Sequence, residues 1–345
     1  RQPRDAASQN TRSILRRGPG PAGNEGRFVY TVVVVNRRSF LSSLALAMPA
    51  WSAGRGEGDW RYYGGDAGAT RFSALDQIRR GNVAKLKVAW THRCGDASQR
   101  PSTTIECTPL VVDGVMYLTT ARVQVRALEA ATGKSLWNFN PRGDLGRGAG
   151  VNRGVAWFED GKHRRVFAAI RDKLYSLDPR TGEPARSFGD NGVVDLTAQF
   201  DRDMTKLSFR VTSPPVIFED TVIVGGGGGE GPRPEAPGHV RGYDVFTGKR
   251  KWIFHTIPHP GEFGYDTWPK DAWQRSGAAN NWAGMSVDLK RGWVFVSTGS
   301  ASFDFWGGDR HGDNLFSDCV LALDARTGRR IWHYQTVHHD VWDYD

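Results

Sequence analysis

The sequence predicts an all-β protein of the β-propeller kind, and two observations lead to this fold class. From Asp59 onward, short β-rich runs alternate with turns, and few stretches have the period of an amphipathic helix. Within these runs one local pattern recurs: an apolar strand, an acidic residue, a Thr-Gly turn and, usually, a strand that carries tryptophan. Its four copies run from Ala127 to Trp137, Leu177 to Phe188, Tyr243 to Trp252 and Leu323 to Trp332.

Each copy is typical of one corner of a propeller blade. Glycine supplies the positive φ of a tight hairpin, threonine and the acidic residue hydrogen-bond the turn backbone, and tryptophan packs between neighbouring sheets. A single sheet of this kind cannot bury both faces, whereas several sheets in a ring bury them and leave only short edges. The recurrence therefore favours a propeller over a sandwich or four unrelated hairpins. The uneven spacing of the copies predicts long loops, where functional sites are commonly built.

The first 53 residues are expected to lie outside this fold. The chain does not start with Met, and residues 1–30 are predicted to be a non-native or disordered head. Residues 31–53 are typical of a twin-arginine export signal, because Asn36-Arg37-Arg38-Ser39-Phe40-Leu41 precedes a short apolar stretch and small residues. That stretch is too short to span a bilayer, which favours export to the periplasm over a membrane anchor. Residues 54–345 are expected to form the propeller part.

Composition narrows the class of protein. The 345 residues, 39% of them hydrophobic, can bury a sizeable core. The net charge of +9 owes much to arginines in the first 27 residues, and no basic stripe or recognition helix accompanies it, so no nucleic-acid partner is expected. Cys94, Cys107 and Cys319 are widely spaced, which gives neither a disulfide framework nor a zinc site. No strand leads into GxGxxG and a helix, which argues against a nicotinamide dehydrogenase.

Runs at both ends of the predicted propeller resemble one known family. The opening run, Asp59-Trp60 with Tyr63-Gly64-Gly65-Asp66 and Arg71-Phe72-Ser73, looks like the start of pyrroloquinoline quinone (PQQ) dehydrogenases. Near the end, Trp306-Gly307-Gly308-Asp309-Arg310 and the run from Tyr334 to Asp343 resemble the glucose-dehydrogenase branch more than the methanol-dehydrogenase branch. Members of the family are eight-bladed propellers, so the resemblance implies that this chain supplies about the first half of one.

The resemblance also implies a cofactor site at the propeller axis. PQQ is a flat quinone with three carboxylates, held over Ca²⁺, and it requires an aromatic floor, cationic or hydroxyl donors and oxygen ligands for the metal. The residues that match cofactor contacts are Glu106, Arg153, Thr212, Gly228, Gly229 and Trp282. The residues at the metal positions are Glu230, Ser300 and Asp343, and Asp343 also matches the catalytic base.

Several of these residues have competing interpretations. Glu230 follows a run of five glycines, but no Gly-Lys-Ser/Thr and no helix follow, which disfavours a phosphate loop and leaves a plain surface loop as the alternative. With 13 tryptophans in the chain, Trp282 without the resemblance would more often be a core residue. His338, His339 and Asp340 could form a metal tract, but no further clustered histidine completes a tetrahedral set. We expect them to orient the segment that carries Asp343.

The chain departs from the methanol-type pattern at two places. Ser300 stands where those relatives have an asparagine calcium ligand, and Ala149-Gly150 stands where they have a vicinal cysteine pair over the quinone. A serine hydroxyl is a weaker calcium ligand than an amide oxygen, although Ser300 or Ser302 could offer an oxygen directly or through water. What covers the quinone is left open.

The reaction implied by the resemblance is the oxidation of a sugar, polyol or alcohol. Asp343 takes the hydroxyl proton, hydride passes to C5 of the quinone while Ca²⁺ polarises its carbonyl, and a quinone or cytochrome c accepts the electrons. A primary-alcohol dehydrogenase and a non-catalytic propeller scaffold are the alternatives. Glu230, Arg153, Trp282 and Asp343 occurring together favours the enzyme. The 345-residue chain alone is expected to be inactive, and peripheral association with the membrane is left open.

Overall fold

The computed structural model describes residues 29–34 and 58–344, apart from 101, 142–149 and 233. Four antiparallel sheets of four strands follow one another along this part of the chain. Their strands are β3 (Leu110–Val112), β4 (Val115–Thr119), β5 (Val125–Glu129) and β6 (Ser135–Phe139); β7 (Ala156–Glu159), β8 (Arg164–Ile170), β9 (Lys173–Leu177) and β10 (Val193–Asp195); β11 (Val216–Phe218), β12 (Thr221–Val224), β13 (Val240–Asp244) and β14 (Arg250–Phe254); and β16 (Met285–Asp288), β17 (Trp293–Ser297), β19 (Cys319–Asp324) and β20 (Arg330–Gln335).

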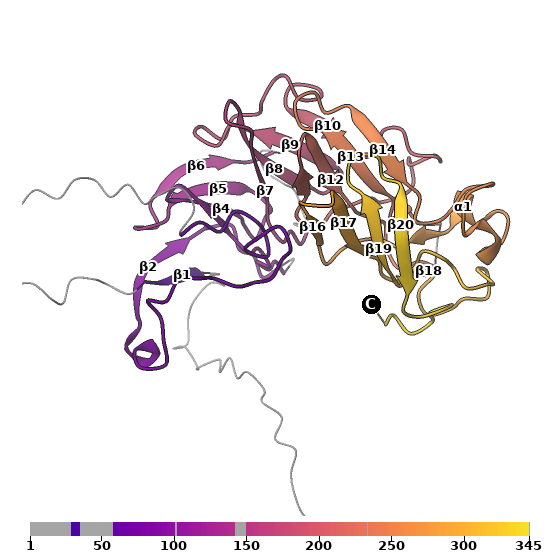
Figure 1. Ribbon diagram of the computed structural model, residues 1–345, viewed down its shortest axis with the longest axis horizontal. Helices are drawn as coiled ribbons and strands as arrows, with labels where there is room; N and C mark the ends of the chain where they lie inside the picture. Colours follow the sequence, from indigo (N-terminus) through magenta and orange to yellow (C-terminus); the bar gives the residue numbers. More distant parts are fainter. Residues whose placement is uncertain (1–28, 35–57, 101, 142–149, 233, 345) are drawn as a thin grey trace, which may run out of the picture.

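The sheets are arranged as successive blades. In each sheet, every strand pairs with the next one along it, and the sheets follow an arc with the C-terminus on its concave side (Figure 1). Two smaller elements precede the first blade, the pair β1 (Val29–Val34) with β2 (Lys87–Arg93) and the 3₁₀ turn Val83–Lys85. Further along the chain come the 3₁₀ turn Tyr265–Thr267, the single-turn helix α1 (Ala272–Arg275) and the pair β15 (Gly277–Ala278) with β18 (Ala301–Ser302). The predicted all-β class is confirmed.

The four Thr-Gly turns follow the third strand of each blade and lead toward its fourth. The glycines have φ values of 72° (Gly133), 75° (Gly182), 71° (Gly248) and 72° (Gly328), a region that L side chains avoid. In the last copy, Asp324 Oδ1 accepts hydrogen bonds from the backbone N–H of Thr327 at 2.9 Å and from its hydroxyl at 2.9 Å. This is the turn chemistry that the repeated pattern predicts.

Tryptophans join neighbouring blades through these turns. The indole nitrogen of Trp252 on β14 donates to Ala325 O of the next blade at 3.1 Å, and a Cβ on Gly328 would lie 2.5 Å from that indole ring. Trp137 on β6 makes the equivalent bond to Pro179 O at 2.9 Å, where Gly182 is the facing glycine. The glycine is therefore required twice, once for its φ and once for the space that the indole fills.

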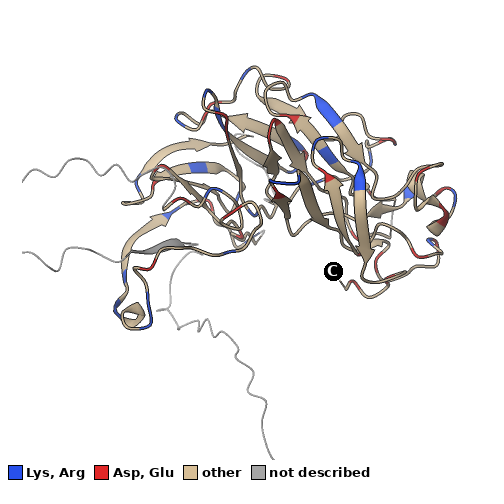
Figure 2. Cartoon of the chain, in the orientation of Figure 1, with Lys and Arg blue, Asp and Glu red and all other residues tan. Residues whose placement is uncertain are grey.

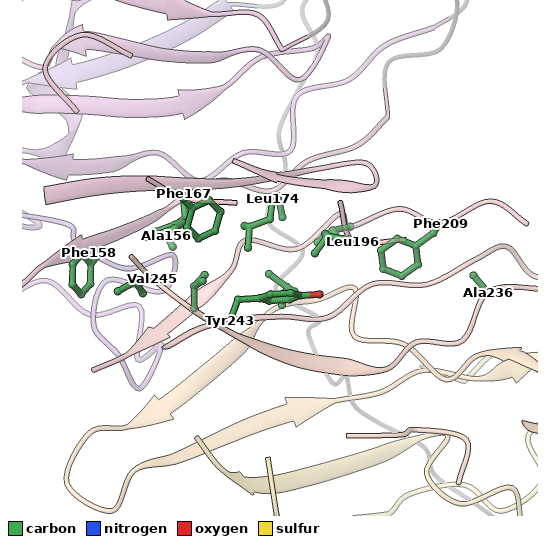
Figure 3. Packing of buried hydrophobic residues seen from close by; sticks show 14 residues of the cluster. Ala156, Phe158, Phe167, Leu174, Leu196, Phe209, Ala236, Tyr243 and Val245 are labelled. Carbon is green, nitrogen blue, oxygen red and sulfur yellow. The ribbon is translucent and has the colours of Figure 1, made fainter. Parts of the chain in front are cut away.

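The contact between the second and third blades is different. The second copy carries Phe188 in place of tryptophan, and Gly248 of the third copy therefore meets Val194 and the backbone of Gly189 instead of an indole. Phe188 is itself fully buried and packs edge-on against Phe167, with ring centroids 5.4 Å apart. A hydrophobic cluster fills the space between these two blades, and Figure 3 shows part of it. The core is thus divided into layers between blades.

Of the first 53 residues, the structure describes only residues 29–34. Residues 29–34 form β1, which pairs with β2, although the sequence predicted them to belong to the head and export signal, outside the fold. The twin-arginine motif at residues 36–41 lies outside the described residues, and the domain boundaries stay a prediction. No helix in the described part of the chain is long and apolar enough to cross a membrane. Acidic and basic residues are interspersed over the blades (Figure 2).

Candidate cofactor and catalytic site

A pocket of about 570 Å³ is built by the segments that flank the first two strands of successive blades. Because adjacent strands are antiparallel, the start of a first strand and the end of a second strand lie at the same end of a sheet. Arg153 precedes β7, Thr212 precedes β11 and Trp282 precedes β16, whereas Glu230 follows β12 and Ser300 follows β17. The blade topology therefore brings together residues far apart in the chain.

Eight of the nine predicted site residues line this pocket. They are Arg153, Thr212, Gly228, Gly229, Glu230, Trp282, Ser300 and Asp343. The ninth, Glu106, reaches the site through an ion pair, in which its Oε2 lies 2.9 Å from an amino nitrogen of Arg153. The structure shows this grouping, and the individual roles stay predictions.

Arg153 is held from two sides. Besides the ion pair with Glu106, it donates to the carbonyl of Trp282 at 3.2 Å, and its guanidinium carbon lies 5.1 Å from the centre of that indole. These contacts fix the planar guanidinium beside an aromatic face. Trp282 is 39% exposed and lines the pocket, unlike the tryptophans that join the blades. A fixed guanidinium beside an exposed indole can bind a flat anionic ring through charge and stacking.

The glycine run has a packing reason that the sequence did not reveal. A Cβ on Gly227 would lie 2.7 Å from Cβ of Asn280, and one on Gly228 would lie 2.7 Å from the backbone nitrogen of Ala236. The run therefore lies closely against its own protein, in addition to lining the pocket. At its end, the N–H of Gly229 donates to Glu235 at 3.0 Å. This bond fixes the start of the loop that carries Glu230.

Three carboxylates line the pocket. Glu230, Asp304 and Asp343 all line it together with the hydroxyl residue Ser300, and the N–H of Asp304 donates to Glu230 O at 3.3 Å. Carboxylate and hydroxyl oxygens are the ligands that Ca²⁺ prefers. Asp304 was missed by sequence reasoning, although an acidic residue just before the quoted Trp306 run was a signal for it. The lining also includes Arg210 and Asn280, which no motif had indicated.

The buried Asp340 fixes the segment that carries Asp343. Its buried carboxylate accepts the N–H of Trp342 at 3.1 Å and of Tyr344 at 2.9 Å, and the hydroxyl of Ser300 donates to the same group. Asp343 lies between the two bound N–H groups with a φ of 57°. The predicted orienting role is thus seen at Asp340. The ring of His339 hydrogen-bonds Gly312 O at 2.9 Å. Among the described residues, His339 does not belong to a group of three or more histidine, cysteine or acidic side chains that could share a metal ion.

The hydrogen bonds keep Asp340 ionised. Desolvation acts to raise its pKa, but the bonds from Ser300 and from the backbone N–H groups of Tyr344 and Trp342 outweigh this effect, and the net result is a lowered pKa. An ionised carboxylate accepts all three bonds, whereas a protonated one would direct a proton at a donor. The charge of Asp340 is therefore part of what holds Asp343 in place.

The blades and the pocket together define a class: a β-propeller protein whose polar pocket can hold a flat anionic cofactor and a hard divalent cation. The sequence profile of the PQQ "Glucose/ethanol/alcohol dehydrogenase, beta-propeller domain" matches residues 60–345. The chain belongs to this family of PQQ-dependent quinoprotein dehydrogenases, and its fold is the propeller of that family, as the sequence predicted.

Individual relatives carry several substrate names. The chain is 37% identical over 316 residues to the quinate/shikimate dehydrogenase (quinone) of Acinetobacter baylyi, covering 83% of this chain and 38% of the relative. It is 33% identical over 319 residues to quinoprotein glucose dehydrogenase A of Acinetobacter calcoaceticus, covering 85% and 39%. The structure of a quinohemoprotein alcohol dehydrogenase from Pseudomonas putida matches with a TM-score of 0.71 and 33% identity, over 84% of this chain and 41% of that one. The chain spans about 40% of the length of these relatives.

Proposed function

We propose that the pocket binds PQQ and Ca²⁺, and that the full-length protein oxidises a secondary or primary hydroxyl group of a sugar, polyol or alcohol. The observation that carries this proposal is the meeting of Arg153, Trp282, Glu230 and Asp343 in one pocket. The size of the pocket lies within the range of small-molecule and cofactor sites. Since these residues come from different blades, a fold kept only as a scaffold would have no reason to assemble them.

The residues fit the cofactor in their chemistry. Arg153 and Arg210 supply positive charge for the carboxylates of PQQ, and Trp282 supplies the aromatic floor. Glu230, Asp304 and Asp343 supply oxygen ligands for Ca²⁺, with Ser300 as a weaker donor. When bound, PQQ supplies the hydride acceptor and Ca²⁺ the Lewis acid. Glu106 acts through Arg153, which it orients by the ion pair.

Asp343 is proposed as the base that takes the proton of the substrate hydroxyl. A carboxylate next to a divalent cation stays ionised at neutral pH and can therefore accept a proton. The carboxylate of Asp340 fixes the backbone on both sides of Asp343, so the base does not need to be ordered at the moment of reaction.

The substrate and the electron acceptor are proposed on the level of chemical class. Quinate, glucose and alcohols, which appear in the names of the relatives, share a CH–OH group, and the names of two of them also include a quinone or a haem. We propose the same donor group for this protein, with a quinone or cytochrome c as acceptor. Periplasmic location is proposed from the motif at residues 36–41.

The test is an Asp343→Asn variant of the full-length protein, reconstituted with PQQ and Ca²⁺. Turnover of sugars and alcohols, measured by dye reduction, should fall by at least about 100-fold because the base is lost. Bound PQQ, measured after removal of the free cofactor, should remain. Asp160→Asn, which changes an exposed turn carboxylate between β7 and β8, is the matched control and should keep full activity. Unchanged turnover in Asp343→Asn would refute the role of this residue.

A further inference from the structure

A cluster of three histidines lies at the end of the third blade that faces the pocket, where β13 begins and β14 ends, but the histidines do not line the pocket. His239 directly precedes β13 and His255 directly follows β14; since Val240 pairs with Phe254, the next rung brings the two histidines together. Their ring centroids are 4.7 Å apart. His259, four residues further on, stacks on His255 at 3.8 Å with an interplanar angle of 5°. One nitrogen of each ring lies within 4.8 Å of the others.

Carboxylates contact each histidine of this cluster. Oδ2 of Asp201 lies 3.3 Å from Nε2 of His239 and 2.6 Å from Nε2 of His259, and Oε1 of Glu262 lies 2.8 Å from Nδ1 of His255. In metal sites, ligating histidines usually have their second ring nitrogen bound by a carboxylate, which fixes the tautomer and the direction of the free lone pair. Each of the three histidines has a carboxylate at one ring nitrogen, and in His239 the other nitrogen also accepts a hydrogen bond.

The protonation state of His239 suits a metal ligand. Burial, only partly offset by the hydrogen bond to Asp201, lowers the pKa of His239 to about 3, so this imidazole is neutral at physiological pH. The charged groups that face the rings are Asp201, Glu262 and Arg202, whose Nε lies 3.2 Å from Asp201. Two carboxylates against one guanidinium leave a net negative charge beside the rings, and this charge favours a cation.

We propose that His239, His255 and His259 bind a divalent transition-metal ion of borderline softness, such as Zn²⁺, with Asp201 and Glu262 orienting the rings. Imidazole nitrogens suit Zn²⁺, whereas Ca²⁺ requires a cage of oxygens, so the two ions would occupy separate sites. Zn–N bonds of 2.0–2.1 Å place tetrahedral ligand atoms roughly 3.4 Å apart, so the widest pair must close by roughly 1.4 Å. Tilting one ring of the stacked pair achieves this.

His239 determines the cost of binding. Its Nε2 contacts Asp201 and its Nδ1 accepts the N–H of Thr256 at 3.1 Å, so a metal–nitrogen bond replaces one of these two hydrogen bonds. The gain is a link between three segments: residues 201–202, the paired ends of β13 and β14, and the loop at 255–262. The segment between β12 and His239 carries Glu230, so the ion would brace one wall of the cofactor pocket.

The experiment uses the full-length protein, freed of transition metals and kept in excess Ca²⁺ so that the calcium site is filled. Isothermal titration with Zn²⁺ should show one equivalent bound, with a higher melting temperature in the bound form. The double variant His255→Gln/His259→Gln, which leaves the fully buried His239 in place, should bind Zn²⁺ at least about 100-fold more weakly and show no shift. His163→Gln, an exposed histidine outside the cluster, is the matched control and should behave as the wild type.

Two further outcomes are decisive. Co²⁺ in place of Zn²⁺ should give the visible absorption of a nitrogen-ligated ion, and this absorption should be lost only in the double variant. If wild type and double variant bind the same equivalents of Zn²⁺, or if neither binds any while both remain folded by circular dichroism, the site does not exist. These readouts do not involve PQQ or turnover, so they are independent of the proposed function.

Discussion

A single buried carboxylate, Asp340, determines where the proposed base lies. It links Ser300, which follows the second strand of the last described blade, to the backbone at Trp342 and Tyr344. The buried guanidinium of Arg310 also donates to the carbonyl oxygen of Asp340 and to that of Asp304 at 3.3 Å. Both acidic segments of the pocket are therefore fastened by side chains that themselves are not proposed to react.

Asp340→Asn should destabilise the protein in a pH-dependent way. At neutral pH, asparagine keeps one acceptor oxygen but loses the charge and the second one, and this should lower the free energy of unfolding by about 2 kcal/mol. The folded pKa of Asp340 lies below its usual value, so its contribution is complete above about pH 4 and is lost as the pH falls through the folded pKa. Chemical unfolding of both proteins between pH 7 and pH 3 should show the difference shrinking at the acid end. A constant difference would contradict this account.

At this scale the sequence predicted the residues that match a motif and missed those defined by packing. Arg153, Glu230, Trp282 and Asp343 stand in recognisable runs, and the structure brings them into one pocket. Asp304 could have been found next to the Trp306 run. The partnership of Ser300 with Asp340 could not be predicted, because it joins residues 40 positions apart through the geometry of one blade.

At the scale of elements, the turn that joins two blades carries two constraints on one glycine. Gly328 needs a positive φ, and its missing Cβ also leaves the space that Trp252 fills. The four turns could be predicted from the repeated pattern, whereas their place before each fourth strand is seen only in the structure. The indole contact to the following blade could not, because the pattern shows one blade at a time. The third copy, where Val194 replaces the indole, shows that the contact tolerates another apolar group.

Gly328→Ala should be more harmful than the same change in a turn without an indole. Gly161 has a φ of 87°, and a Cβ added there would have no heavy atom within 4 Å, so Gly161→Ala should cost only the backbone strain, about 1 kcal/mol. Gly328→Ala adds overpacking against Trp252 and should cost about 2 kcal/mol more. The difference between the two variants, measured by urea unfolding, isolates the packing contribution. Equal losses would mean that the indole moves aside freely.

At the scale of the whole molecule, the described blades form only part of a propeller of this family. Trp332 on β20 is 38% exposed, whereas Trp252, at the equivalent place on β14, is 7% exposed under the turn of the next blade. Tyr334 on the same strand is also exposed. In the relatives, whose length this chain spans to about 40%, further sequence is available to cover such an edge.

The 345-residue chain expressed alone should therefore aggregate or lack a cooperative melt. An uncovered outer strand presents unpaired backbone groups and apolar side chains, both of which promote association. The full-length protein should instead be monodisperse by light scattering. The fluorescence of Trp332 should also be quenched less by a dissolved quencher than in the isolated chain. A monomeric 345-residue sample with a sharp melt would show that four blades are sufficient.

The most direct test of the central claim is a PQQ titration of the full-length protein, with and without Ca²⁺, by equilibrium dialysis. The wild type should bind one PQQ per chain, and the affinity for PQQ should be high only when Ca²⁺ is present. Arg153→Ala should weaken binding by at least about tenfold, because a charged hydrogen bond to a carboxylate is lost; Arg180→Ala, on an exposed turn, should not. Binding that ignores both Ca²⁺ and Arg153, or no binding at all, would contradict the assignment of this pocket.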